Sequence, residues 1–246
     1  MKTPMRALMS ATILFAAIAS NGPGRADSGA APDEIGLKPI ELLGKRIFED
    51  GNLSEPRGQS CSSCHDPAKA FQGNAGSNNP ALARGALPER LGDRNTPTLM
   101  YAAFVPPFGF QDKKDEETGK IEKVAVGGLF WDGRAEDLTA QVEGPLLNPR
   151  EMNNPSKNAV VDKIRASAYS NLAREVFGAG VFDNSDEAFR KLATAVASYE
   201  KTPRFSPFSS KFDDYLRGKA KLTKLEARGF ALFKDKKKGN CLACHV

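Results

Sequence analysis

The cysteines and histidines of this 246-residue chain are confined to two short motifs. The chain has four cysteines and two histidines, and all six belong to two copies of the pattern Cys-x-x-Cys-His. The first copy contains Cys61, Cys64 and His65, and the second contains Cys241, Cys244 and His245. Because histidine is so scarce in this chain, chance is a poor explanation for two histidines directly after a Cys-x-x-Cys pair.

The chemistry that fits this spacing is covalent attachment of a c-type haem. Two thiols three positions apart at the start of a helix reach the two vinyl groups of one porphyrin. The adjacent histidine then turns its imidazole under the iron as the proximal ligand. The two motifs therefore predict two covalently bound haems, one at His65 and one at His245.

Three other uses of these residues are open from the pattern alone. An exported chain could form disulfides from its Cys-x-x-Cys pairs, which would leave the histidines unexplained. Four thiolates could bind zinc, but zinc ribbons place their two pairs closer than Cys61 and Cys241, which are 180 positions apart. A thioredoxin-like redox site would need a βαβ context, which the sequence does not indicate.

Residues 1–26 have the features of a secretory signal peptide. Lys2 and Arg6 form a basic start, and residues 7–20 are almost entirely apolar but too short to span a bilayer. Small residues at cleavage spacing end at Ala19 and at Ala26. A retained membrane anchor is the alternative. Cleavage predicts a periplasmic protein in an oxidising compartment.

The overall charge is a weak guide to binding partners. The full chain carries a formal charge of +5, and removal of residues 1–26 takes away three basic and no acidic residues, which leaves +2. The basic pI of about 9.0 therefore gives no case for a nucleic-acid partner. An apolar content of 40% excludes a disordered chain, and no second apolar run reaches membrane length.

Hydrophobic spacing predicts a mostly α-helical chain. Apolar side chains at helical intervals predict helices over residues 36–49, 135–143, 157–176 and 185–200. The second of these is expected to end at Gly144-Pro145. A further helix opens at Thr223, where Glu226 completes a capping box.

The remaining segments are predicted as loops. Residues 73–93 are rich in Gly, Asn, Pro and Arg, and residues 105–128 contain a charged run that is interpreted as a solvated surface turn. Residues 201–221 are interpreted as an interdomain linker with a short helical turn near residues 212–217. No strong alternation of apolar and polar residues indicates a strand.

A helix followed by Cys-x-x-Cys-His occurs twice, which predicts two cytochrome c-like lobes, each around one covalent haem. The N-terminal haem domain is assigned to residues 27–202, and the start of the C-terminal haem domain to residues 203–246. Only 44 residues follow Thr202, which is about half a lobe. The second lobe is therefore expected to be incomplete, as in a truncated gene or a partial sequence.

Several blocks resemble the bacterial di-haem cytochrome c peroxidases and their MauG-like relatives, over residues 36–246. The blocks are Arg-Asn-Thr-Pro-Thr-Leu at 94–99, Phe-Trp-Asp-Gly-Arg at 130–134, Gly-Pro-Leu-Leu-Asn-Pro-Arg-Glu-Met at 144–152, Ser-Pro-Phe at 206–208 and Tyr-Leu-Arg-Gly at 215–218. The resemblance implies that hydrogen peroxide reacts at the N-terminal haem. Electrons would come from a small periplasmic donor, a cytochrome c or a cupredoxin, through the C-terminal haem.

The resemblance also implies roles for individual residues. Trp131 would lie between the two haems, although packing in the core is its alternative role. Gln141 and Glu151 match the family's distal glutamine and glutamate, ten and twenty positions after that tryptophan. Splitting a peroxide O–O bond requires a proton to move from one oxygen to the other, which a carboxylate does and an amide assists by orienting the peroxide. A surface carboxylate is the alternative for Glu151.

Two further implications concern metal ligands. Asn95 matches a family calcium ligand, whose other protein partners would come from the missing part of the C-terminal lobe. The chain has no third histidine to cap the resting peroxidatic iron, so this iron is expected to be open, as in MauG-like proteins. Oxidation of a protein substrate, or plain di-haem electron transfer without peroxidase activity, are therefore the alternative functions.

Overall fold

The computed structural model describes residues 33–73, 81–114 and 118–245. The chain divides into two units, residues 1–35 and 36–246, and the helices and strands of the described residues all lie in the second. The predicted signal peptide, residues 1–26, lies outside the described residues. Within the described ranges, no helix has both the length and the apolar character needed to cross a bilayer.

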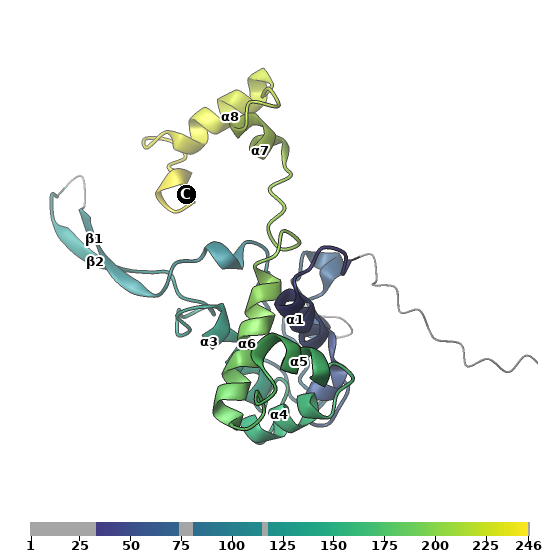
Figure 1. Cartoon of the computed structure of the whole chain (residues 1–246). Helices are drawn as coiled ribbons and strands as arrows, with labels where there is room; N and C mark the ends of the chain where they lie inside the picture. Colours follow the sequence, from purple (N-terminus) through teal and green to yellow (C-terminus); the bar gives the residue numbers. More distant parts are fainter. Residues whose placement is uncertain (1–32, 74–80, 115–117, 246) are drawn as a thin grey trace, which may run out of the picture. The chain divides into compact units, whose positions relative to one another are not determined.

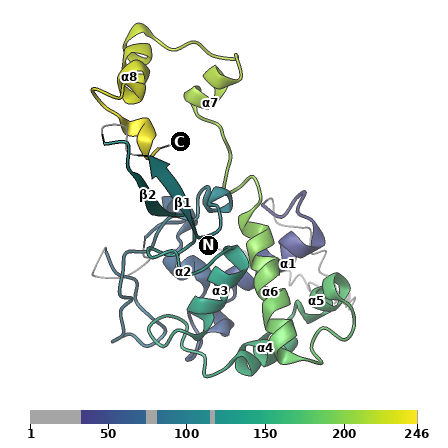
Figure 2. The ribbon, with the colours of Figure 1, turned by 90° about the vertical axis from the view of Figure 1, so that its left-hand side faces the viewer.

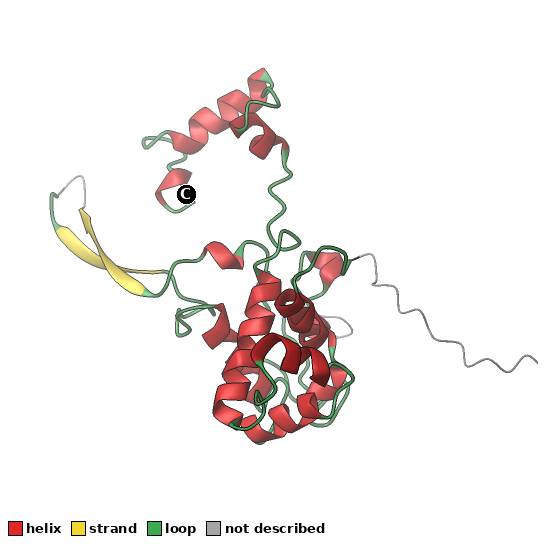
Figure 3. Cartoon of the chain, viewed as in Figure 1, coloured by secondary structure: helices red, strands yellow, loops and turns green. Residues whose placement is uncertain are grey.

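The described chain is mostly helical, as the sequence predicts (Figures 1 and 3). The α-helices are α1 (Pro39–Glu49), α2 (Cys61–Cys64), α3 (Leu138–Leu147), α4 (Lys157–Arg165), α5 (Ser170–Phe177), α6 (Ser185–Glu200), α7 (Lys211–Leu216) and α8 (Lys224–Lys234). Short 3-10 turns are η1 (Gly51–Leu53), η2 (Pro67–Lys69), η3 (Ala102–Phe104) and η4 (Cys241–Ala243).

Helix α6 is the centre of the core and packs against α1, α3 and α4 (Figure 2). Its closest neighbour is α1, because Gly44 lets the two backbones approach: a Cβ atom at Gly44 would overlap the carbonyl oxygen of Ala195. Four aromatic rings fill the end of this crossing, with centroids 5.6 Å apart for Phe48 and Tyr199 and 4.2 Å apart for Phe71 and Phe205. The region beside the first Cys-x-x-Cys-His motif is therefore rigidly packed.

A β-hairpin occupies the segment that the sequence predicts as a loop, so that prediction is wrong. Strand β1 (Gly109–Lys114) pairs antiparallel with β2 (Ile121–Val126), from Gly109 opposite Val126 to Lys114 opposite Ile121 (Figure 3). Most side chains of both strands are exposed. Since neither face of the hairpin is buried, the sequence lacks the two-residue alternation by which strands are recognised.

Two helix predictions also need correction. Residues 157–176 form two helices, because α4 ends at Arg165 and Ser167 folds back to donate its hydroxyl to the carbonyl of Ile164 at 2.7 Å. Helix α3 starts later than expected, after the N-cap Asp137, and continues through Pro145 to Leu147. Proline removes one helical hydrogen bond, yet the amide of Asn148 still donates to the carbonyl of Gly144 at 3.0 Å.

Other helix predictions are confirmed. Helices α1 and α6 match their expected spans within a few residues, and α7 corresponds to the predicted helical turn in the linker. Helix α8 has Thr223 as its N-cap: the Glu226 amide donates to the Thr223 hydroxyl at 3.3 Å, and the Thr223 amide donates to the Glu226 carboxylate at 2.6 Å. Local capping chemistry is thus a reliable guide in this chain.

Candidate functional site

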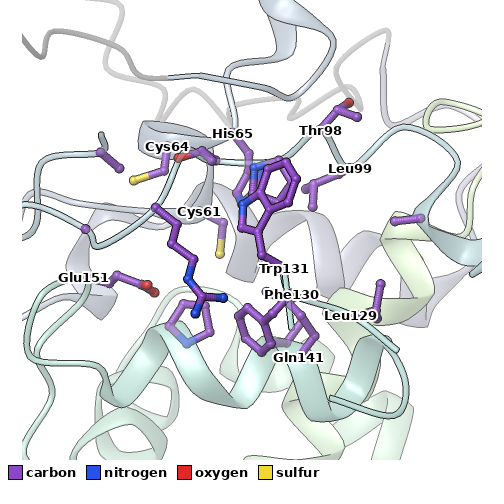
Figure 4. Close-up of a pocket in the computed structure, with 18 of the residues that line it drawn as sticks. Cys61, Cys64, His65, Thr98, Leu99, Leu129, Phe130, Trp131, Gln141 and Glu151 are labelled. Atoms are coloured by element: carbon purple, nitrogen blue, oxygen red, sulfur yellow. The ribbon is translucent and has the colours of Figure 1, made fainter. Parts of the chain in front are cut away.

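The first Cys-x-x-Cys-His motif forms the short helix α2 and the residue after it (Figure 4). Ser60 is the N-cap, its amide donates to the Ser63 hydroxyl at 3.0 Å, and the His65 amide donates to the Cys61 carbonyl at 2.9 Å. Both thiols are free. The motif therefore holds two reduced thiols and one imidazole on a single fixed turn.

The His65 ring is oriented by a backbone carbonyl. Its Nδ1 lies 3.0 Å from the carbonyl oxygen of Phe71, which Ala70 and Phe71 bring into place with left-handed φ angles of 54° and 55°. This bond assigns the ring proton to Nδ1 and leaves the lone pair of Nε2 available to a metal. Burial lowers the pKa of His65, against the opposing effect of the Phe71 and Pro97 carbonyls. A neutral imidazole is the form that ligates iron.

Burial dominates the electrostatics of the two thiols. Burial raises the pKa of Cys61 strongly, with further contributions from the charges of Glu200 and Cys64. Burial also raises the pKa of Cys64, against a hydrogen bond from Gln59. Redox-active and zinc-bound cysteines are instead thiolates, favoured by a lowered pKa. In this structure burial favours the neutral form of both thiols.

A strained loop places the only tryptophan at the edge of the site. Leu129 and Ala135 form an isolated β-bridge, and between them Phe130 adopts a left-handed φ of 63°. The guanidinium of Arg134 lies 3.6 Å from the centre of the Phe130 ring. Strained residues of this kind cluster at functional sites.

Trp131 is held in this loop by its indole nitrogen, which donates to the backbone carbonyl of Asn95 at 2.8 Å. Its side chain is 62% exposed, so it is not a core residue. The alternative role of core packing is therefore wrong. The same hydrogen bond joins two of the blocks singled out in the sequence, at 94–99 and 130–134.

The predicted acid–base pair comes from α3 and the turn after it. Gln141 lies on α3, and Glu151 follows three residues after Asn148, whose side-chain amide donates to the Glu151 carboxylate at 3.1 Å. Burial raises the pKa of Glu151, while the charge of Arg134 and the bond from Asn148 act against it and the charge of Asp93 reinforces it. Glu151 is half-buried, which does not fit a free surface carboxylate.

One cavity of about 580 Å³ brings these residues together (Figure 4). This volume falls within the roughly 300–1,000 Å³ typical of cofactor sites. Residues far apart in the sequence line it, and among them are Cys61, Cys64, His65, Asn95, Trp131, Gln141 and Glu151. Figure 4 shows Cys61, Glu151 and Gln141 around the same space. Thiol, imidazole, amide and carboxyl groups therefore line one pocket.

Two lining residues carry buried oxygens with no hydrogen-bond partner among the described residues. They are Gln59, through Oε1, and Glu200, through Oε2. Sequence reasoning missed Glu200, although a signal was present: it lies four residues after Val196 on the apolar face of α6. A carboxylate at a core position of a helix is rare enough to mark a site.

The second Cys-x-x-Cys-His motif is not part of the cavity lining. Cys241, Cys244 and His245 lie at and just after η4, and none of them lines the cavity. Their segment has its own contacts, including the Lys211–Glu226 ion pair at 2.7 Å and the Phe212 and Phe230 rings at 5.0 Å. The described residues contain no cluster of three or more His, Cys, Asp or Glu suited to a metal ion, and Asn95 remains a predicted calcium ligand.

Comparisons with known proteins show the family to which the chain belongs. The family described as di-haem cytochrome c peroxidase matches residues 38–221. The chain is 43% identical over 212 residues to methylamine utilization protein MauG of Paracoccus denitrificans, covering 84% of this chain and 51% of the relative. It is 31% identical over 232 residues to cytochrome c551 peroxidase of Nitrosomonas europaea, covering 93% and 57%.

A solved structure shares the fold. The crystal structure of the diheme peroxidase BthA from Burkholderia thailandensis matches with a TM-score of 0.71 and 38% identity, over 85% of this chain and 52% of that one. The chain thus spans about half the length of the curated relatives it matches.

Proposed function

Because the chain belongs to the di-haem cytochrome c peroxidase family, we propose that it is a periplasmic oxidoreductase that reduces hydrogen peroxide to water at a haem held by His65. The observation that carries this proposal is the single cavity, which collects the first Cys-x-x-Cys-His motif, Trp131, Gln141 and Glu151. The periplasmic location depends on the signal-like residues 1–26.

The residues of the cavity fit a c-type haem. The thiols of Cys61 and Cys64 would bond to the porphyrin, and the free Nε2 of His65 would ligate the iron. Cys241, Cys244 and His245 would hold the second haem in the same way. The haem supplies the redox-active iron, and the chain supplies orientation and proton transfer.

Proton transfer is the task of Glu151 in this proposal. Its carboxylate would accept a proton from one oxygen of the peroxide and deliver it to the other oxygen, which would leave as water, while the haem would supply the electrons. Gln141 orients the peroxide through its amide without changing its charge. Burial raises the pKa of Glu151, the positive charge of Arg134 opposes that shift, and only the ionised form accepts a proton.

Electron supply involves the exposed edge of the site. We assign entry of electrons from a small cytochrome c or cupredoxin to the His245 haem. Trp131 lines the cavity and is 62% exposed, which suits a relay between two haems. Asn95, whose carbonyl holds the Trp131 indole, would use its side chain as a calcium ligand between the lobes.

Oxidation of a protein substrate, as in MauG-like proteins, is the second candidate function. One observation favours it: the chain is 43% identical to the methylamine utilization protein MauG of Paracoccus denitrificans. Both functions share the haem, Glu151 and Gln141, and they differ in the source of the electrons.

Rapid mixing of the resting ferric protein with peroxide tests the proposal. We expect the haem spectrum to change without prior reduction, and a reduced small cytochrome or cupredoxin to be oxidised over repeated turnovers. Oxidised haem that persists with such donors but decays with a protein substrate would favour the second function. A resting protein that is inert to peroxide would indicate a di-haem electron carrier and overturn both.

A further inference from the structure

We propose that Glu200 takes up a proton when the haem held by Cys61, Cys64 and His65 takes up an electron. The proposal rests on the haem assignment of the proposed function and adds a redox-linked proton site to it. Glu200 is separate from the peroxide-facing pair Gln141 and Glu151, and none of the sequence blocks includes it.

The position of Glu200 carries the inference. It is the last residue of α6, its side chain lines the same cavity as Cys61, and only 4% of the residue is exposed. Its Oε2 atom has no hydrogen-bond partner among the described residues. A buried carboxylate without a partner is unfavourable, and a proton on that oxygen removes the charge.

The surroundings of Glu200 leave its charge uncompensated. Burial raises the pKa of its carboxyl to about 8. On α1, the helix closest to α6, Lys45 is already paired with Glu49 at 2.6 Å. The other charged or titratable residues on the packed helices and the cavity wall are Glu41 and Arg46 of α1, Glu143 of α3, Lys157, Asp162, Lys163 and Arg165 of α4, and Cys61, Cys64, His65, Asp93, Arg94, Tyr101, Arg134 and Glu151 of the cavity.

Simple electrostatics links this carboxyl to the redox state of the haem. Ferric haem has one more positive charge than ferrous haem, and a positive charge nearby favours the ionised carboxylate. Adding one electron removes that charge, so the carboxylate binds one proton from solvent and becomes a neutral acid. One electron and one proton enter together, and no bond other than the new O–H bond forms or breaks.

The midpoint potential of this haem measures the coupling directly. We expect the midpoint potential of this haem in the purified protein to fall as pH rises through the range in which the Glu200 carboxyl group titrates. The slope should reach at most about 59 mV per pH unit, which is the limit for one proton coupled to one electron. In Glu200→Gln this slope is expected to be lost. The haem held by His65 can be told from the other haem by cyanide binding, because its iron is the one expected to be open.

Two further variants make the test decisive. Glu187→Gln removes an exposed carboxylate from the same helix and should keep the parent slope. Glu200→Asp retains a carboxyl group and should keep a slope, displaced along the pH axis. If Glu200→Gln fails to load haem, an infrared measurement on the parent protein still tests the inference. Its reduced-minus-oxidised difference spectrum should contain the band of a newly protonated carboxylic acid.

The outcomes separate this inference from the proposed function. A loaded protein that reacts with peroxide but has a pH-independent potential, or a Glu200→Gln variant with the parent slope, would overturn the inference alone. A protein that binds no haem at Cys61 and Cys64 would overturn both.

Discussion

Glu151 and Arg134 both line the cavity but come from different parts of the chain, and the charge of Arg134 acts on the Glu151 carboxyl group. Burial raises the pKa of Glu151, and the charge of Arg134 opposes this shift. A general acid–base residue must both accept and release a proton, so the neighbours that shift this pKa bear on the proposed role.

Substitution of Glu151 by glutamine removes the titrating group and keeps its size. We expect the reaction with peroxide to slow by about 10²–10⁴, equivalent to roughly 3–5 kcal/mol of barrier. Stopped-flow mixing of the resting protein with peroxide measures the rate. Glu136→Gln, at an exposed position just before α3, is the matched control and should react like the parent. Equal rates in Glu151→Gln and Glu136→Gln would show that the carboxylate is structural.

The pH profile of the same reaction should respond to the neighbours of Glu151. The ionised form accepts the proton, so the rate falls as pH drops through the Glu151 pKa. Arg134→Gln removes a charge that lowers this pKa, and Asp93→Asn removes one that raises it. The acid limb should therefore move to higher pH in the first variant and to lower pH in the second. Shifts in the same direction would contradict this electrostatic account.

Individual site residues differ in how far the sequence could predict them. Spacing singles out the cysteines and histidines of the two motifs, and resemblance singles out Trp131, Gln141 and Glu151. The structure brings the first motif and these three residues into one cavity. The role of Arg134 depends on a fold of the 130–134 loop that no local pattern encodes. The sequence marks Glu200 as a carboxylate on the apolar face of α6, but only the structure shows that this residue lines the cavity.

At the scale of elements, the close crossing of α1 and α6 fixes the wall that carries Glu200. Gly44 is the contact point, where a Cβ atom would overlap the Ala195 carbonyl and lie 2.9 Å from the Tyr199 Cβ. Backbone atoms in two packed helices cannot yield as a flexible side-chain tip does, so the helices themselves would have to separate.

Gly44→Ala tests this crossing. Overpacking of this kind typically costs about 1–3 kcal/mol, and we expect a lower free energy of unfolding in chemical denaturation. Gly229→Ala in α8 is the matched control, because a Cβ atom there meets nothing within 4 Å. Alanine at that helical position should be neutral or stabilise by up to about 1 kcal/mol. Tolerance of Gly44→Ala without loss of stability would argue against the tight crossing.

Elements with a buried face or a cap were predictable, and the others were not. The core stripe of α6 and the Thr223 cap of α8 mark their helices clearly. The break between α4 and α5 was missed because apolar spacing continues across it while the Ser167 hydroxyl turns the backbone. The β1–β2 hairpin was missed because its residues are mostly exposed.

At the scale of the whole molecule, charge is distributed unevenly along the chain. Residues 217–246, which contain the second Cys-x-x-Cys-His motif, include nine basic and two acidic residues. Residues 27–216 include 23 basic and 28 acidic residues. The two haem motifs therefore belong to segments of opposite net charge, a difference that the overall value of +5 conceals.

The predicted export and haem attachment can be tested together through the mass of the mature protein. We expect cleavage after Ala26, and a mass that exceeds that of the cleaved chain by two haems when the protein is expressed with a haem-attachment system. Intact-mass spectrometry checks the cleavage position and the number of haems in one measurement. Replacing Cys61 and Cys64 by serine should remove one haem and leave the other. An intact residue 1–26 segment, bound zinc or a haem-free mass would contradict the assignment.

The hydrogen bond that fixes Trp131 to the Asn95 carbonyl has an optical consequence. Trp131 is the only tryptophan in the chain, it lines the cavity, and its indole is tied to a neighbouring loop. All indole fluorescence therefore comes from one fixed position beside the porphyrin site. Because a porphyrin absorbs where indole emits, filling of this pocket should extinguish that emission, so the chain contains its own reporter of haem insertion.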